Sequence, residues 1–264
     1  MRAVKKYVVY TALFGDYDSL IEPDVRNSEC DFICFTDQPN LVSNFWKIRV
    51  VNRSDIPPNL LNREYKVLPH KYLAQYNSSL YIDSNIGVKS DPTPLFESLN
   101  ENEPIFIANH PFRKCVYEEL EACFKSGKIT KEVKCLIVNK YLSEGVPENN
   151  GLTENNIILR LHHNKKVIDL MESWHDLIFN FCSRDQISLP YLIWSMRINI
   201  SPLSVSSKKP NRFFYFRPHK YAGDNFNLIK RFLFNISMRR SDNYFYYVVA
   251  KSFDKIYNFK SKLK

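Results

Sequence analysis

The 264-residue sequence contains only six glycines and lacks several familiar catalytic motifs. Because the glycines are scattered, no Gly-rich loop is available to grip a phosphate, which argues against a Walker-type NTPase and against a nucleotidyltransferase. The patterns G-x-S-x-G and H-E-x-x-H are missing, which excludes the hydrolases and metallopeptidases built on them. His162 and His163 are adjacent, but no acid stands at ligand spacing from them.

The sequence also lacks the signs of a secreted or membrane-spanning chain. Its six cysteines form neither a CxxC pair nor a Cys/His cluster at zinc spacing, so we expect reduced thiols in a cytoplasmic protein. The opening stretch, "MRAVKKYVVYTALFGDYD", has an apolar run of about eight residues that ends at acids without a small-residue cleavage site. This favours a buried first strand over a signal peptide. No segment approaches the roughly 20 apolar residues of a membrane span.

No internal repeat or low-complexity linker divides the chain, so its length predicts one domain, or one domain with an appendage. The net charge of +9 is unevenly spread, because residues 227–264 carry nine Lys or Arg against two Asp. We therefore expect a folded domain over residues 1–226 and a basic tail over residues 227–264.

The tail shows helical periodicity twice. One apolar stripe comprises Ile229, Phe232, Leu233 and Ile236, and a second comprises Phe245, Val248, Val249, Ser252, Phe253 and Ile256. Basic amphipathic helices with aromatic side chains suit an anionic membrane surface. The alternative is a pair of helices packed on their own domain with a solvated basic face.

Upstream of the tail, strand-like and helical segments alternate. The runs "KYVVYTALF", "CDFICFTD", "SLYIDSNIGV" and "PIFIANHP" read as strands, and residues 59–76 have the apolar spacing of one helix. A further strand, "NIILRLH", precedes a helix over 165–181. This alternation predicts an α/β sheet, in which ligands gather at the carboxyl ends of strands. Asp37, Asp83 and His110 all lie at such predicted ends.

Asp83 is the residue with the clearest chemical potential. A carboxylate at the end of a buried strand is costly unless a cation pairs with it. Asp83 and Asn85 are two residues apart, so in an extended segment their oxygens point the same way and suit Mg²⁺ or Mn²⁺. The alternative is a plain Asx turn, because D-x-N is common in turns.

Seven stretches together resemble a known family. They are "YTALFGDYD", "ICFTD", "NREYKVLPHKYL", "LYIDSNI", "HPFRKCVYEE", "EGVPENNGLTENNIILR" and "SRDQISLPY", and in this order they are similar to the blocks of the DUF616 (TOD1/MUCI70-like) glycosyltransferases. That family is similar to the GT-A superfamily and, more distantly, to glycosyltransferase family 8. The resemblance covers roughly residues 7–220 and leaves the tail outside.

The resemblance implies a single GT-A domain of the Rossmann-like α/β class, in which a D-x-D-type motif holds a metal on the donor diphosphate. Here the motif is Asp83-Ser84-Asn85, so Asn85 replaces the usual second acid. His219 is the candidate third ligand of an Mn²⁺ or Mg²⁺ cofactor, the alternatives being a phosphate contact or plain packing.

The resemblance also implies roles for the other blocks. Arg63 and Lys66, three apart on one helical face, would reach the phosphates or the sugar, unless that face is only solvated. The residues expected to hold the base and ribose are the backbone of Thr11 and Ala12, the ring of Tyr17 and the carboxylate of Asp37.

Two further blocks are expected to handle the sugar and the acceptor. The first supplies His110, Arg113, Glu118 and Glu119. In the second, Asp185 and Gln186 are the candidate catalytic pair. Asp185 would act as general base if the reaction inverts the anomeric centre, or would bind the donor sugar, with Gln186 near the reacting face, if configuration is retained. The alternative for Asp185 is a helix N-cap paired with Arg184.

The sequence therefore predicts a metal-dependent glycosyltransferase that moves a hexosyl unit, of galactosyl or galacturonosyl type, from a UDP-sugar to a glycan. A lipid-linked acceptor in surface-polysaccharide synthesis, on the cytoplasmic face of the membrane, would account for the tail. The rival is a basic nucleic-acid-binding or membrane-binding protein without catalysis. Because the charge is concentrated in the tail and acids follow the strands, we expect no nucleic-acid partner.

Overall fold

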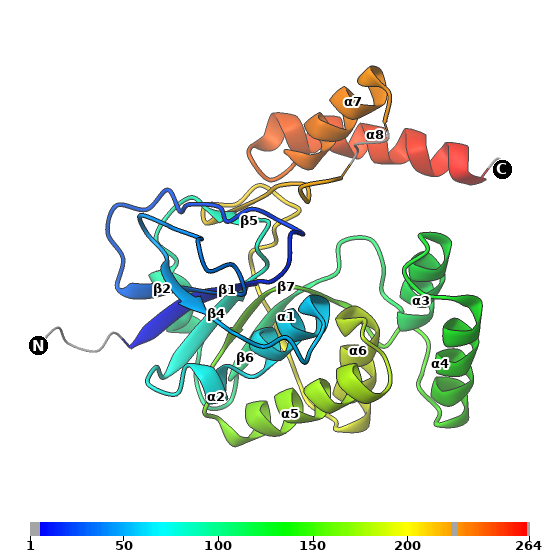
Figure 1. Ribbon diagram of the computed structural model, residues 1–264. Helices are drawn as coiled ribbons and strands as arrows, with labels where there is room; N and C mark the ends of the chain where they lie inside the picture. Colours follow the sequence, from blue (N-terminus) through cyan, green and yellow to red (C-terminus); the bar gives the residue numbers. More distant parts are fainter. Residues whose placement is uncertain (1–5, 223–225, 263–264) are drawn as a thin grey trace, which may run out of the picture.

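A seven-stranded sheet forms the centre of the computed structural model, which describes residues 6–222 and 226–262, and of residues 255–262 only the backbone (Figure 1). The strand order is β3-β2-β1-β4-β7-β6-β8, and within this sheet only β7 runs antiparallel to the rest. The expected α/β class with a mostly parallel sheet is confirmed. The strands are β1 (Tyr7–Leu13), β2 (Cys30–Thr36), β3 (Lys47–Val50), β4 (Ser78–Ile82), β6 (Ile105–Asn109), β7 (Thr153–Arg160) and β8 (Ser201–Pro202).

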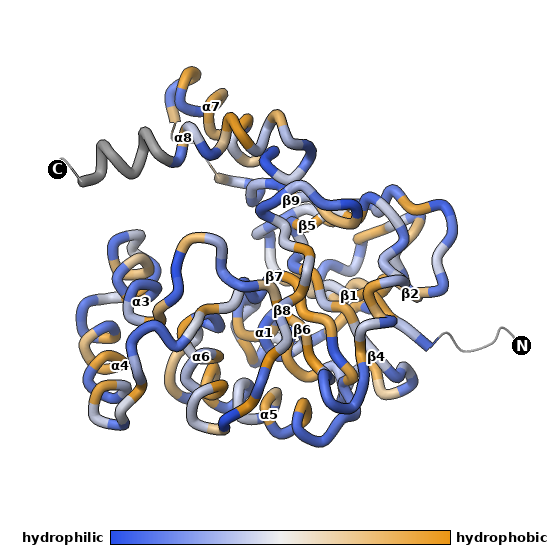
Figure 2. Tube along the Cα trace, turned by 180° about the vertical axis from the view of Figure 1, so that it is seen from behind, coloured by the Kyte–Doolittle hydropathy of each residue, from blue (hydrophilic) through white to orange (hydrophobic). Residues whose placement is uncertain are grey.

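Apolar side chains cover both faces of the central strands. All five residues of β4 are buried, as are six of the seven in β1, which is the pattern of a strand enclosed on both sides. Figure 2 shows this apolar centre in orange, with β1, β4, β6 and β7 running through it. The sheet therefore offers polar groups to solvent mainly at its ends.

Helices α1 (Pro58–Val67), α5 (Lys165–Asn180) and α6 (Asp185–Ser195) contribute apolar side chains to the core on one face of the sheet. The expected helix over 165–181 is confirmed. The single helix expected over 59–76 is wrong, because the chain forms α1 and then a short α2 (Pro69–Tyr72). Pro69 has no N–H to donate and disfavours helical geometry at Leu68, so the helix ends there.

Helices α3 (Val116–Lys125) and α4 (Lys131–Ser143) form a hairpin beside the sheet (Figure 1). A 3₁₀ helix, η1 (Thr93–Ser98), precedes β6. A second, smaller sheet has two strands. That small sheet pairs β5 (Ile86–Val88) with β9 (Phe214–Phe216) in antiparallel fashion. The Tyr215 ring lies directly over Gly87, where an added Cβ would come within 2.1 Å of it. The pairing joins the segment after Asp83 to the segment before His219.

The tail forms two helices, α7 (Leu228–Met238) and α8 (Tyr244–Lys262), which pack on each other. The turn between them docks on the small sheet, because Ser241 accepts Lys89 Nζ at 3.1 Å and the Phe216 N–H at 2.8 Å. Asp242 also binds Arg217 at 2.8 Å. The side chain of Ile256, the last residue of the second predicted apolar stripe, lies outside the described part of the chain. No helix in the described part of the chain is long and apolar enough to cross a membrane.

Candidate active site

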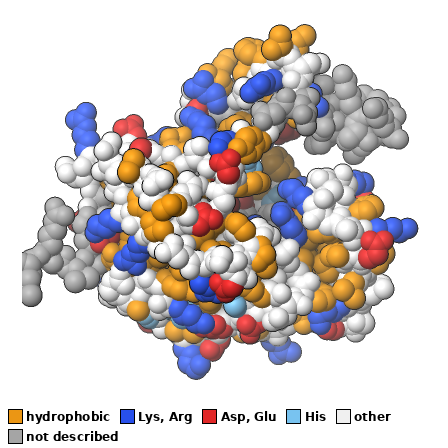
Figure 3. Space-filling model, in the orientation of Figure 1, with side chains coloured by type: hydrophobic (Ala, Val, Ile, Leu, Met, Phe, Trp, Pro, Cys, Tyr) orange, Lys and Arg blue, Asp and Glu red, His pale blue; other side chains and the backbone are white. Residues whose placement is uncertain are grey.

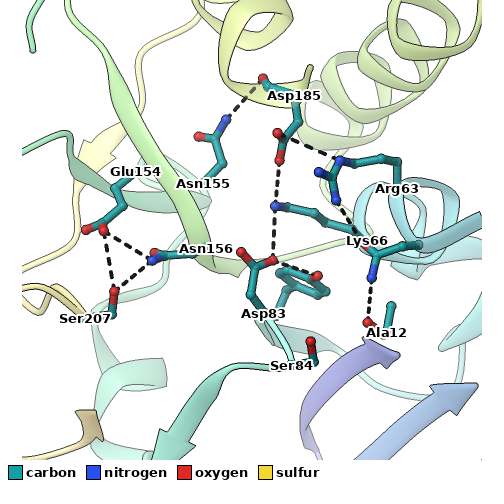
Figure 4. Close-up of polar contacts among 12 residues, drawn as sticks. Ala12, Arg63, Lys66, Asp83, Ser84, Glu154, Asn155, Asn156, Asp185 and Ser207 are labelled. Carbon is teal, nitrogen blue, oxygen red and sulfur yellow. Dashed lines mark hydrogen bonds and ion pairs between the residues drawn. The ribbon is translucent and has the colours of Figure 1, made fainter. Parts of the chain in front are cut away.

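Lys66 lies between two of the predicted site acids. Its Nζ donates to Asp185 Oδ2 at 2.7 Å and to Asp83 Oδ1 at 3.3 Å. Arg63, one turn earlier on α1, has its Nε 3.8 Å from Asp185 Oδ1. Figure 4 shows these four side chains converging between α1, the end of β4 and the start of α6. Arg63 and Lys66 thus share a helix face, and that face meets two carboxylates rather than solvent.

Asp185 is held as an ion by its neighbours. Burial alone would raise its pKa, but the charges of Arg63 and Lys66 and the Lys66 hydrogen bond outweigh that effect and hold the pKa well below the ordinary value. Arg184, not Asp185, is the N-cap residue of α6, and the Asp185 carboxylate forms an ion pair with Lys66. The helix-cap interpretation of Asp185 is therefore wrong.

Gln186 lies beside Asp185 on the first turn of α6. Its Nε2 donates to the main-chain oxygen of Thr153 at 3.1 Å, at the start of β7. This contact joins α6 to the sheet edge and leaves the amide oxygen of Gln186 for a ligand. The catalytic roles of Asp185 and Gln186 stay predictions.

Directly after Asp83, Ser84 connects the strand end to the loop that follows β1. Ser84 Oγ donates to Asp18 Oδ2 at 2.7 Å, and both Asp18 oxygens lie 3.0 Å from His219 Nδ1. The exposed ring of Tyr17 lies over His219, with ring centroids 4.5 Å apart. Asp18 was not predicted as a site residue. The sequence indicates it only through its position as an acid shortly after the apolar run of β1.

Asn85 has a different environment from the one expected of an open metal ligand. Its side chain is buried and its Nδ2 donates to the main-chain oxygen of Arg217 at 3.1 Å. The Arg217 N–H donates in turn to the main-chain oxygen of Asn85 at 2.9 Å. These bonds hold β9 against β5. His219, two residues after Arg217, then meets Asp18, which also accepts the Ser84 hydroxyl. A ligand role for Asn85, which stays a prediction, would use its amide oxygen.

A groove of about 650 Å³ lies at the carboxyl ends of β1 and β2, where the nucleotide is expected. Both oxygens of Asp37 accept the Gly15 N–H at 3.0 Å, so this carboxylate shapes the loop after β1. Thr11 is buried within β1, and the Ala12 oxygen accepts Asn62 Nδ2 at 2.5 Å. The groove is lined by Gly15, Asp16, Asp37, Gln38, Pro39, Asn40, Leu41 and Val42.

On the other side of Asp83, the predicted acceptor residues follow β6. His110 Nε2 lies 3.1 Å from Arg113 Nη2, and Arg113 Nε donates to Glu119 Oε2 at 2.6 Å. Glu119 is buried, whereas Glu118 is exposed and accepts the Lys114 N–H at 3.2 Å. The structure brings His110, Arg113 and Glu119 together and leaves Glu118 at the entrance of α3.

Three polar residues at the start of β7 also belong to the site, and sequence reasoning missed them. Asn155 Nδ2 donates to the main-chain oxygen of Asp185 at 3.1 Å, and Asn156 Nδ2 donates to Glu154 Oε1 at 3.1 Å and to Ser207 Oγ at 2.7 Å (Figure 4). The signal was present, because "TENNIILR" opens with four polar residues before its apolar run begins. As β7 is antiparallel, that polar half lies at the same edge as the end of β4.

A divalent cation would find part of its ligand set here. Asp83 Oδ2 accepts no hydrogen bond from a described residue, and a carboxylate behind an imidazole, as in Asp18 behind His219, is a common support for a metal-bound histidine. Among the described residues no three His, Cys, Asp or Glu side chains converge closely enough to hold an ion. Mg²⁺ or Mn²⁺ bound here would therefore take its remaining ligands from substrate phosphates and water.

The fold and the site together define the chain as an α/β protein with a polar site at the carboxyl edge of its sheet. The family model of the TOD1/MUCI70 glycosyltransferase-like domain matches residues 35–217. The chain belongs to the TOD1/MUCI70 family, and the expected enzyme class, a glycosyltransferase, is confirmed. The matched range contains Asp83 and Asp185 but neither β1 nor the tail.

The solved structures that are similar to the chain include two glycosyltransferases. The apo structure of the bifunctional glycosyltransferase WbbM has 10% sequence identity and a TM-score of 0.46, covering 91% of this chain and 45% of WbbM. The galactosyltransferase LgtC, solved with donor and acceptor sugar analogues, has 13% identity and a TM-score of 0.44, covering 77% of this chain and 74% of LgtC. The chain thus spans less than half the length of WbbM. Among curated proteins no match was found.

Proposed function

We propose that the chain transfers a hexosyl unit, of galactosyl or galacturonosyl type, from a UDP-sugar to a glycan or lipid-linked glycan with the help of Mn²⁺ or Mg²⁺. Membership of the TOD1/MUCI70 family supports glycosyl transfer as the reaction. The choice of a UDP-sugar as donor rests on the resemblance of the sequence blocks to GT-A glycosyltransferases. The observation that carries the site assignment is the position of Asp83. It ends a buried central strand, between the groove at β1 and β2 and the basic residues that follow β6.

Each part of the site then has a physical task. Asp83 and His219 would hold the metal, which supplies electrostatic stabilisation of the leaving diphosphate. Arg63 and Lys66 balance the charges of Asp83 and Asp185 before any substrate binds. The exposed ring of Tyr17, which lies against the His219 ring, is available to stack on the donor.

The electrostatics of Asp185 favour one of its two predicted roles. A carboxylate whose pKa lies well below the ordinary value is a weak proton acceptor near neutral pH. We therefore assign Asp185 to hydrogen bonding with the donor sugar, where an ionised acceptor is an advantage, rather than to deprotonating the acceptor hydroxyl. Gln186, held at the same helix start, would contact the sugar beside it.

The direct test is a hydrolysis assay with UDP-galactose and UDP-galacturonate in the presence of Mn²⁺, in which the rate of UDP release is measured. We expect measurable release by the wild type and a rate about 100-fold lower for Asp83→Asn, because electrostatic groups at a reacting centre are worth that much. Asp55→Asn, at an exposed acid outside the site, is the matched control. Equal rates for Asp83→Asn and the wild type would refute the assignment.

We also propose that the tail binds an anionic membrane surface, on the cytoplasmic leaflet. The turn between α7 and α8 packs on the domain, which is part of the alternative interpretation of the tail. The two helices nevertheless keep apolar side chains exposed. The same two helices and the turn between them also carry exposed basic residues, among them Lys230, Arg239 and Lys251. Exposed apolar side chains next to basic ones suit lipid headgroups and the acyl boundary beneath them. The exposed apolar side chains are those of Leu228, Ile229, Phe232, Leu233, Tyr244, Phe245 and Val248.

Sedimentation with liposomes tests the membrane proposal. The wild type should co-sediment with vesicles that contain phosphatidylserine and much less with pure phosphatidylcholine. Phe232→Ser combined with Phe245→Ser should lower binding, because each substitution removes apolar area from the interface. Leu136→Ser with Leu142→Ser, at exposed positions of α4, is the control. Unchanged binding of the Phe232/Phe245 variant would refute the proposal.

A further inference from the structure

A second group of cationic side chains lies beside the end of β6, apart from Arg63 and Lys66. It combines Arg113 from the loop after β6, Lys208 from the loop after β8 and Arg240 from the tail turn. The Arg240 guanidinium lies 5.9 Å from the ring centroid of Phe112, which places the tail turn over this loop. In the view of Figure 3 the surface is hollowed between the tail helices and the α3–α4 hairpin. Three distant segments thus place cationic side chains at one wall of the site. Arg113 forms an ion pair with Glu119 and Arg240 one with Asp254, which leaves Lys208 as the cation to be explained.

The hydrogen bonds of His110 show that an acceptor is missing beside Arg113. His110 Nδ1 accepts the main-chain N–H groups of Phe112 at 3.2 Å and Arg113 at 2.9 Å. A neutral imidazole with an acceptor at Nδ1 carries its hydrogen on Nε2. Arg113 Nη2, which can only donate, lies 3.1 Å from that Nε2. Two donors therefore face each other, and an anionic oxygen in front of them would accept from both.

Arg113 is fixed in place for such a role. Its Nε donates to the buried carboxylate of Glu119 at 2.6 Å, and the other Glu119 oxygen contacts Cys123 Sγ at 3.3 Å. One edge of the guanidinium is thereby oriented by the protein, and Nη2 stays beside His110. Burial, together with the charges of Arg113 and Lys208, lowers the pKa of His110 to about 4, so the ring is neutral at physiological pH.

Lys208 lacks a carboxylate partner within the described part of the chain. Its Nζ lies 3.0 Å from the centroid of the Phe216 ring. Glu154 is the acid whose charge acts most on Lys208. Its oxygens accept hydrogen bonds from Asn156 Nδ2 at 3.1 Å and Ser206 Oγ at 2.7 Å instead. Burial lowers the pKa of Lys208 to about 8. Lys208 is half-buried. Since an ammonium that is partly removed from water and lacks a counter-ion is costly, a bound anion would stabilise it.

We propose that Lys208, Arg113 and His110 form a subsite for an anionic group, a carboxylate or a phosphate, on the acceptor. The inference rests on the proposed glycosyl transfer and adds the acceptor's chemical class. The sheet order supports an acceptor location, because β7 separates β4 from β6 and puts β6 about 10 Å from Asp83, on the side away from the β1–β2 groove. A donor diphosphate bound at Asp83 would leave this wall open to the second substrate.

Thermal-shift titration with small anions tests the subsite directly. The probes are glucose 1-phosphate, glucuronate and, as a neutral control, methyl glucoside, each with and without UDP and Mn²⁺. We expect both anions to raise the melting temperature and methyl glucoside to have no effect. The anion with the larger shift identifies the acceptor group as phosphate or carboxylate.

Two neighbouring lysines provide a matched pair of variants. Lys208→Met should weaken the apparent affinity for the anions about tenfold, as expected for loss of one charge-assisted contact. Lys209→Met, at an exposed position, should leave it unchanged, and Lys208→Arg should restore part of it. Anion shifts that persist in Lys208→Met, or an equal shift with methyl glucoside, would overturn the subsite. A Lys208-dependent anion shift without any UDP binding would instead refute the proposed donor and leave the subsite standing.

Discussion

At the scale of single residues, Lys66 is the side chain on which the candidate site depends most. It is 1% exposed and contacts two carboxylates that come from β4 and α6. Its main-chain oxygen accepts the Tyr10 hydroxyl at 2.7 Å and the buried Arg160 at 2.6 Å, so backbone and ammonium are both held. The charge and the position of Lys66 are thus set by contacts from four parts of the chain.

Replacing Lys66 by Met should destabilise the fold. We expect the free energy of unfolding to fall by about 3–5 kcal/mol, because the change leaves the buried Asp185 without the counter-ion that is hydrogen-bonded to it. Urea denaturation at pH 7 measures this. Adding Asp185→Asn should recover part of the loss, since it removes the unpaired charge. Lys71→Met, at an exposed lysine on α2, is the control and should change stability by less than about 0.5 kcal/mol.

A Lys66→Met variant as stable as Lys71→Met would contradict the account of this cluster. Such a result would mean that solvent reaches Asp185 and replaces the ammonium at little cost.

The sequence could identify Asp83, Asp185, Arg63 and Lys66 as candidates, but not their mutual contacts. Helical spacing predicts that Arg63 and Lys66 share a face, whereas what that face meets depends on α6, whose Asp185 is 119 residues from Lys66. Asp18 was missed for the same reason. Its partners, Ser84 and His219, are 66 and 201 residues away, and no local pattern signals such a contact.

At the scale of elements, the small β5–β9 sheet positions the end of the candidate metal site. It begins three residues after Asp83 and ends three residues before His219. The Tyr215 ring covers Gly87, so only a residue without a side chain fits at that point of β5. The single strand expected over "SLYIDSNIGV" is wrong, because a turn at Ser84 and Asn85 separates β4 from β5. The segment of β9, "RFFYFRPHKY", could be predicted only as the close of the folded part.

Replacing Gly87 by Ala should separate these two strands. We expect a loss of about 1–3 kcal/mol in the free energy of unfolding, because the new Cβ overlaps the Tyr215 ring. A double variant, Gly87→Ala with Tyr215→Ala, should lose less than the two single changes combined, since the second change removes the overlap. Urea denaturation of the three variants gives the interaction energy, and strictly additive losses would contradict the packing described here.

Other elements were predictable to different degrees. Long runs such as β1, β2 and α5 carry their own signal of apolar periodicity. The tail helices were also predicted from periodicity, and α7 and α8 confirm it. Their docking through Ser241 and Asp242 could not be predicted, because those are ordinary polar residues in a turn.

At the scale of the whole molecule, the sheet collects residues that are far apart in the chain at one edge. The loop after β1, the ends of β4 and β6, the start of β7 and the segment after β9 all meet there. The class of fold and of enzyme followed from the order of sequence blocks. The proposed division into a donor side and an acceptor side could be made only once the strand order was known.

The central claim is that this edge binds a nucleotide diphosphate through a metal at Asp83, and titration calorimetry with UDP tests it most directly. We expect wild-type protein to bind UDP with Mn²⁺, to bind it much more weakly without the metal, and to lose the metal effect in Asp83→Asn. Asp55→Asn should behave as wild type. Binding of UDP that is equally tight with and without Mn²⁺, or unchanged in Asp83→Asn, would contradict the claim.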